Sequence, residues 1–146
     1  MWRAATEDDL KKSISDTEVE AYRAAAVEGS TDPVADLILR TVRLVRGYMR
    51  ANRRIRLSAD EALIPDTLIA PAMDYAAFDV VSRVPVDNTE DRCIRRQQAI
   101  AVFQAVAADH FYVESFEPED EAASGSAARL VSHTPRRVTP EAVNGL

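Results

Sequence analysis

The sequence predicts an all-α fold, a bundle of about four to five helices followed by an extended C-terminal tail. Its 146 residues include only 4 Gly, with 47% hydrophobic and 29% charged residues, a composition that favours helices in a globular protein. Several stretches open with a capping residue and continue with apolar residues three and four positions apart. The length corresponds to one domain.

Two short helices are expected first. Thr6 precedes EDDLKKSI, which places acidic residues in the first helical turn. The next stretch, SDTEVEAYRAAAVEG, offers overlapping capping boxes that begin at Ser15 and Thr17, and Gly29 is its expected end. A helix-turn-helix is disfavoured, because the second helix carries three glutamates against one arginine and would repel DNA phosphates.

A long third helix is expected from Asp32-Pro33, a cap followed by a proline in the first helical position, to about Asn52. Spacings of three and four define its buried face: Val34, Leu37, Ile38, Thr41, Leu44, Val45, Tyr48 and Met49. The opposite face carries Asp36, Arg40, Arg43 and Arg50.

Residues 53–65 lack a sustained period and are predicted to form a connecting loop. A fourth helix is expected over residues 66–84. Pro71 is awkward inside it, because proline clashes with the preceding turn, so the helix should start near Ala70 or kink there. Pro85 is its expected end.

Asn88 or Thr89 is predicted to cap the last long helix, which should end near Ser115. One face of that helix can hold Cys93, Ile100, Phe103, Ala107, His110 and Phe111. The predicted core packs Leu37, Leu44, Val45 and Tyr48 on Val80, Val81, Ile100 and Phe103. The single large aromatics Trp2 and Tyr112 are expected to close this core.

The chain is divided into a helical domain over residues 1–116 and an extended tail over residues 117–146. The tail is rich in Pro, Gly, Ser and charged residues, and it is expected either to have no fold of its own or to become ordered on a partner. Its expected partner-binding residues combine apolar and basic side chains: Leu130, Val131, Pro135, Arg136, Arg137 and Val138.

Charge is unevenly divided along the chain. Residues 40–56 contain seven arginines and no acidic residue, whereas the whole chain has a net charge of −6, so the remainder has a balance of −13. Three interpretations are open: a solvated helix face, a nucleic-acid site, and a subunit or partner interface. The interface is favoured, because Arg binds carboxylates with two hydrogen bonds and is enriched at interfaces. The expected interface residues are Arg40, Arg43, Arg50, Arg53 and Arg54.

Catalytic and metal chemistry are not expected. Cys93 is the only cysteine, and with His110 and His133 it cannot form a spaced zinc motif. His110 lies next to Asp109 but has no matching nucleophile. No apolar run is long enough for a membrane span, and the start MWRAATEDDL lacks the features of a signal peptide, so a cytoplasmic protein without metal or cofactor is predicted.

Three segments, TEDDLKKSISDTEVEAY, DPVADLILRTVRLVRGYMRANRRIRL and IPDTLIAPAMDYAAFDVV, give the chain a resemblance to a phage family. The matching features are an early T-x-x-D-L, a long helix ending in G-Y-M-R-A-N, and a Pro-containing segment before an Ala-rich helix. Over about residues 5–115 the chain resembles the head-to-tail adaptor (connector, head-completion) proteins of long-tailed bacteriophages, including the Mu-like group. It has RRIRLSADEALIP where the family usually has an aromatic-Pro-Leu element.

The resemblance implies a non-enzymatic virion protein at the head–tail interface, made in the bacterial cytoplasm. Twelve subunits would form a homo-oligomeric ring that joins the portal to a tail or stopper protein, and DNA would pass through its channel without sequence-specific binding. A small helical nucleic-acid-binding or regulatory module is the alternative.

Overall fold

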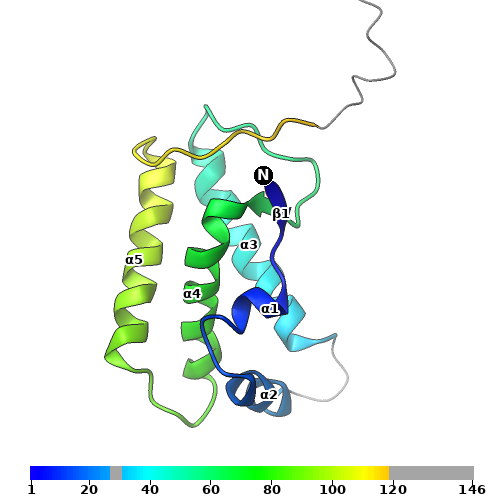
Figure 1. The fold of residues 1–146 in the computed structure, drawn as a ribbon, viewed down its shortest axis with the longest axis vertical. Coiled ribbons are helices and arrows are strands. Elements are labelled where there is room, and N and C mark those ends of the chain that lie inside the picture. Colours follow the sequence, from blue (N-terminus) through cyan, green and yellow to red (C-terminus); the bar gives the residue numbers. More distant parts are fainter. Residues whose placement is uncertain (27–30, 119–146) are drawn as a thin grey trace, which may run out of the picture.

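Helices dominate the part of the chain that the computed structural model describes, residues 1–26 and 31–118. In chain order the elements are β1 (Trp2–Ala4), α1 (Glu7–Leu10), α2 (Asp16–Ala24), α3 (Pro33–Ala51), β2 (Leu63–Pro65), α4 (Asp66–Ser82) and α5 (Glu90–Ala107). Figure 1 shows α3, α4 and α5 running side by side along the long axis, with α1 and α2 to one side. The predicted all-α fold class is confirmed.

Local capping explains where α1, α2, α3 and α5 begin, whereas α4 has no side-chain cap. The hydroxyls of Thr6 and Ser15 each accept a hydrogen bond from an amide three residues later, in reciprocal capping boxes with Asp9 and Glu18. A carboxylate oxygen of Asp32 accepts from an amide of the first turn of α3, and the Thr89 hydroxyl does the same for α5. Of the overlapping candidates at the start of α2, Ser15 is therefore the cap. This helix ends at Ala24, earlier than the expected Gly29.

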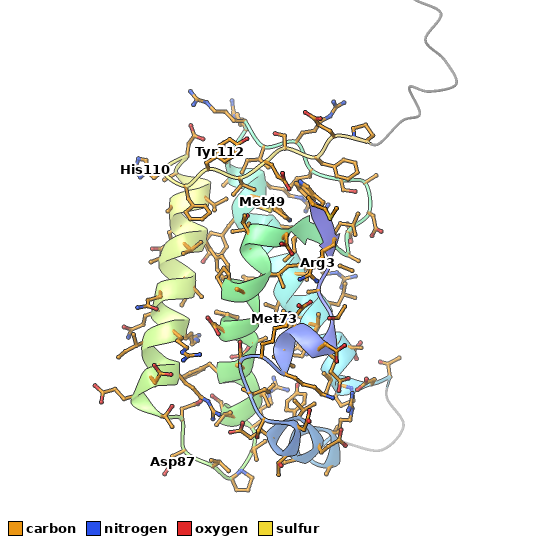
Figure 2. The ribbon with its side chains drawn as sticks, in the orientation of Figure 1. Arg3, Met49, Met73, Asp87, His110 and Tyr112 are labelled. Carbon is orange, nitrogen blue, oxygen red and sulfur yellow. The ribbon has the colours of Figure 1, made fainter. Side chains whose placement is uncertain are left out.

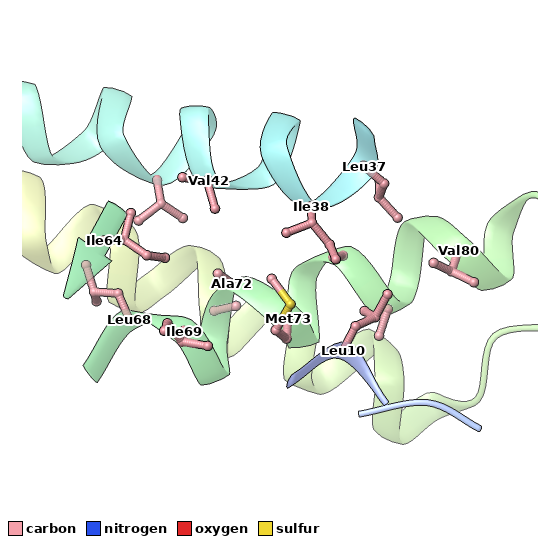
Figure 3. Close-up of a cluster of buried hydrophobic side chains, with 14 of the residues drawn as sticks. Leu10, Leu37, Ile38, Val42, Ile64, Leu68, Ile69, Ala72, Met73 and Val80 are labelled. Carbon is pink, nitrogen blue, oxygen red and sulfur yellow. The ribbon is translucent and has the colours of Figure 1, made fainter. Parts of the chain in front are cut away.

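The core lies between α4 and the elements around it (Figure 3). It contains Leu10 of α1, Leu37 of α3, Ile64 of β2 and Met73 of α4, all almost completely buried. Eight residues of α4 are buried, more than a single stripe of a surface helix, because α3, α5 and the short N-terminal helices all pack on it. These burials hold the three long helices as one unit.

A short antiparallel sheet replaces part of the predicted 53–65 loop. β1 pairs with β2 so that Trp2 lies opposite Pro65 and Ala4 lies opposite Leu63. Ile64 is fully buried in this sheet, and the amide of Asp66 donates to the carbonyl of Met1 at 2.9 Å. The first residues of the chain are thereby fixed to the start of α4.

Helix α4 begins at Asp66, where the predicted 66–84 range begins, and includes Pro71. Of the two alternatives expected at this proline, the later start near Ala70 is therefore wrong. Pro71 lacks the amide that would bond to the carbonyl of Thr67. Thr67 lies on the exposed side of the first turn, where water can reach it, and the buried Leu68 and Ile69 hold this turn against the core. Packing therefore outweighs the local cost of the proline.

Helix α5 ends at Ala107, eight residues before the predicted Ser115. Asp109 has a positive φ of 61°, and the amides of Asp109 and His110 donate to the carbonyls of Val106 and Ala105 at 3.2 and 2.8 Å. This is a Schellman ending with aspartate in the left-handed position. Residues 111–118 then cross the end of the bundle instead of extending the helix (Figure 1).

Most of the residues predicted to form the core are buried, with two corrections. Leu37, Val45, Val80, Val81 and Phe103 are buried, as predicted. The Tyr48 and Phe103 rings lie 5.7 Å apart, and Ile100 is half-buried.

Leu44 is 37% exposed and Tyr112 is 88% exposed, so neither belongs to the core. Leu44 lies between the buried Thr41 and Val45 but is turned toward the solvent side of α3. Tyr112 follows the early end of α5. By contrast, Trp2 packs edge-on against Phe116 at 5.5 Å and donates through Nε1 to the Glu114 carbonyl at 3.1 Å.

Candidate interaction surface

The exposed side of α3 carries three arginines, Arg40, Arg43 and Arg50, which we call the arginine face. Their spacings of three and seven residues place them on one side of the helix. Arg43 and Arg50 approach the carboxylate of Glu61 at 4.0 and 3.8 Å, and the side chains of Arg43, Arg50 and Glu61 are about 60% exposed. Ion pairs this long and this exposed contribute little to stability. Arg40 has no carboxylate partner among the described residues.

Arg46, from the same run of arginines, is 3% exposed and has a structural role. Its guanidinium donates to three backbone carbonyls, those of Ser58, Asp60 and Leu63, at 2.7, 2.9 and 2.6 Å. Burial, with a smaller contribution from the charge of Arg50, lowers the pKa of Arg46. Arg46 therefore fixes the segment before β2 to the middle of α3.

The sequence prediction left Arg46 out of the expected interface residues but gave it no structural role. A signal was present, because Val42 and Met49, four residues before and three after it, are apolar and buried. These positions place Arg46 near the apolar stripe of α3.

The remaining predicted interface arginines, Arg53 and Arg54, lie in the exposed turn after α3. Arg54 donates to the Asp109 carboxylate at 2.6 Å, and the buried Asn52 donates to the same carboxylate at 3.1 Å and to the Val106 carbonyl at 3.0 Å. Arg54 thus supports the end of α5. The predicted tail residues 130–138 lie outside the described residues.

Gly47 lies at the centre of the exposed side of α3. A side-chain Cβ placed at this glycine would have no atom within 4 Å. Its neighbours one turn away, Arg43, Leu44, Arg50 and Ala51, are all exposed. We call the open space over Gly47 the Gly47 notch; Leu44 and Ala51 border it with apolar atoms, and Arg43 and Arg50 lie beside it.

The end of the connection between α4 and α5 and the first residue of α5 carry Asp87 and Glu90, and we call residues 86–90 the acidic loop. The exposed Arg83 lies earlier in the same connection. Val86 is 52% exposed, and the carboxylates of Asp87 and Glu90 have no cationic partner among the described residues. Figure 2 shows Asp87 at one end of the bundle and His110 and Tyr112 at the other. The acidic loop is thus remote from the end of α3 that leads into Arg53 and Arg54.

All the acidic residues of α1 and α2 except Asp8 form ion pairs within the chain. Arg23 binds Glu7, Glu20 and Asp32, and it holds the pKa values of Glu7 and Asp32 below their ordinary range. Arg92 pairs with Glu18 at 2.7 Å. These carboxylates fix α2 to the bundle rather than offering a free binding surface.

The side chains considered for catalysis are not gathered into a site. Cys93 is half-buried near the start of α5, and His110 is exposed beyond its end. Within residues 1–26 and 31–118, no group of three or more His, Cys, Asp or Glu side chains is placed to hold a metal ion.

No protein-family model, curated protein or solved structure matches the chain. Among the helices described, none is long and apolar enough to cross a membrane.

Proposed function

We propose that the protein is a structural subunit that forms a ring between the portal and the tail of a phage-type particle. The arginine face is the observation that carries the proposal. It places Arg40, Arg43 and Arg50 in solvent on the longest helix of the described residues, in a chain that is acidic elsewhere. Arg40 has no carboxylate partner among the described residues, and Arg43 and Arg50 share only the exposed Glu61.

Such a charge division favours head-to-tail association. A basic surface on one subunit can meet an acidic surface on the next, and a heterologous contact of this kind closes into a ring when the rotation permits. The resemblance to head-to-tail adaptors supplies the expected place of the ring, beneath a portal and above a tail or stopper protein. An all-helical domain is the architecture expected of such a subunit.

The test is co-expression of the full chain with the portal protein from the same gene cluster, followed by electron microscopy of the purified portal complexes. A ring of this chain beneath the portal is expected. The double variant Arg43→Glu/Arg50→Glu should keep the wild-type circular dichroism spectrum and be absent from the complexes. Its matched control is Arg56→Glu/Arg83→Glu, which reverses two exposed arginines away from the arginine face.

A portal that binds no wild-type protein would contradict the proposal. Binding of the isolated wild-type chain to DNA, steeply weakened by salt and lost in the arginine-face variant but not in the control, would instead indicate the nucleic-acid module.

A further inference from the structure

Gly47 has no role inside its own subunit that explains a glycine. Its backbone is helical, and the interior of a helix is where glycine destabilises relative to alanine. The space above it is open, so a larger side chain would fit without displacing anything. What glycine does provide at an exposed helical position is close approach by the backbone or side chain of another molecule.

The surroundings of Gly47 specify what can approach. Leu44 and Ala51 give the notch an apolar side, and Arg43 and Arg50 give it a basic side. The carboxylate of Glu61 lies within 4.0 Å of both guanidinium groups, which shows that one carboxylate can bridge these two arginines. A fitting partner therefore presents a small apolar side chain with a carboxylate close by.

The acidic loop of the same chain has this chemistry. Val86 is half exposed and is followed at once by Asp87, with Glu90 at the start of α5 and the exposed Ile94 one turn later. The described residues leave five large apolar side chains exposed, and three of them, Leu44, Val86 and Ile94, lie at the notch or next to the acidic loop. Asp87 and Glu90 have no described cation to satisfy them, unlike the acids bound by Arg23 and Arg92.

We infer that the acidic loop of one subunit docks in the Gly47 notch of the next subunit. Val86 lies over Gly47 against Leu44, and Asp87 and Glu90 bind Arg43 and Arg50 of the neighbour. The two surfaces lie on different parts of the molecule, so the contact is head-to-tail and leaves one notch and one loop free for further subunits. This contact rests on the proposed ring, in which the partner is a second copy of the chain.

Disulfide trapping tests the contact directly. Two variants of the full chain are prepared in a Cys93→Ala background, one with Gly47→Cys and the other with Val86→Cys, and are mixed and oxidised. A disulfide between positions 47 and 86 should form at least about tenfold faster than in a control mixture of Gly47→Cys with Ala101→Cys, because docking raises the local thiol concentration. Ala101 is exposed on α5, away from the acidic loop. Mass spectrometry identifies the joined peptides.

Charge reversal supplies the second measurement. Adding Arg43→Glu and Arg50→Glu to the notch variant should remove the preferential disulfide, and adding Asp87→Arg and Glu90→Arg to the loop variant should restore it. Equal rates for the loop and control mixtures, or a dominant disulfide between two notches, would overturn the docking contact. Rings beneath the portal without the 47–86 disulfide would leave the proposed function standing and remove this contact. Formation of the 47–86 disulfide without any binding to the portal would support this contact and contradict the proposed function.

Discussion

Replacing Arg46 by methionine should destabilise the domain by about 3 kcal/mol. The methionine retains most of the buried apolar stem but removes the guanidinium that donates to the carbonyls of Ser58, Asp60 and Leu63. A buried acceptor left unpaired costs about 1–3 kcal/mol. Two effects reduce the total cost for the three acceptors. The guanidinium charge no longer has to be desolvated, and the carbonyl of the exposed Asp60 can return to water.

Thermal unfolding measures the loss. For a domain of this size 1 kcal/mol corresponds to about 4 °C, so the midpoint should fall by about 12 °C. Circular dichroism follows the helices, and the fluorescence of Trp2, the only tryptophan, follows the strand that pairs with β2. Both should shift together, because Arg46 holds the segment that leads into β2. Arg43→Met, one turn away and exposed, is the control and should change the midpoint little. A loss below about 1 kcal/mol for Arg46→Met would refute the structural role.

Three further predictions concern stability. Leu37→Ala should cost about 2–5 kcal/mol in urea unfolding, whereas Leu44→Ala should cost about 1 kcal/mol or less, since only Leu37 is fully buried; equal losses would contradict this assignment. Gly47→Ala should raise the free energy of unfolding by about 0.5–1 kcal/mol, and a decrease would show that the notch is filled within the subunit. The pKa of Asp9 is held well below its ordinary range, chiefly by the hydrogen bond from Arg3, so its contribution is present above about pH 4 and is lost as the pH falls further. The urea midpoint of Asp9→Asn should be lower than that of the wild type at neutral pH and should fall less as the solution is acidified. An unchanged dependence on pH would exclude the Arg3–Asp9 pair as a cause of acid destabilisation.

Helix starts could be predicted from the sequence because capping is local. Thr6, Ser15, Asp32 and Thr89 each cap a helix through an amide two or three residues away. The end of α5 could not be predicted in this way. The left-handed Asp109 is held by Asn52 and Arg54, which lie more than fifty residues earlier in the chain. No pattern near residue 109 contains that information.

At the candidate site, too, local features could be predicted from the sequence, and features that depend on distant parts of the chain could not. Periodicity alone placed Arg40, Arg43 and Arg50 on the outside of α3, where they are. Burial of Arg46 depends on carbonyls that the segment before β2 brings to it, and the position of this segment depends on pairing between β1 and β2, about sixty residues apart. The notch and the acidic loop were likewise recognisable only once exposure was known, because the sequence predicted Leu44 to be buried.

The proposed contact between subunits is small, and its strength should come from closure of the ring. Arg43 and Arg50 already lie near Glu61, so a carboxylate from a neighbour partly replaces an existing interaction and adds orientation more than affinity. The apolar part is limited to side chains the size of Val86 and Leu44, far less than the area that a stable dimer buries. Two isolated subunits therefore bind weakly and exchange quickly, which is why trapping by a disulfide suits this contact. In a closed ring each subunit is held on two sides, so losing one contact does not release it, and a portal that aligns several subunits makes each later contact effectively intramolecular.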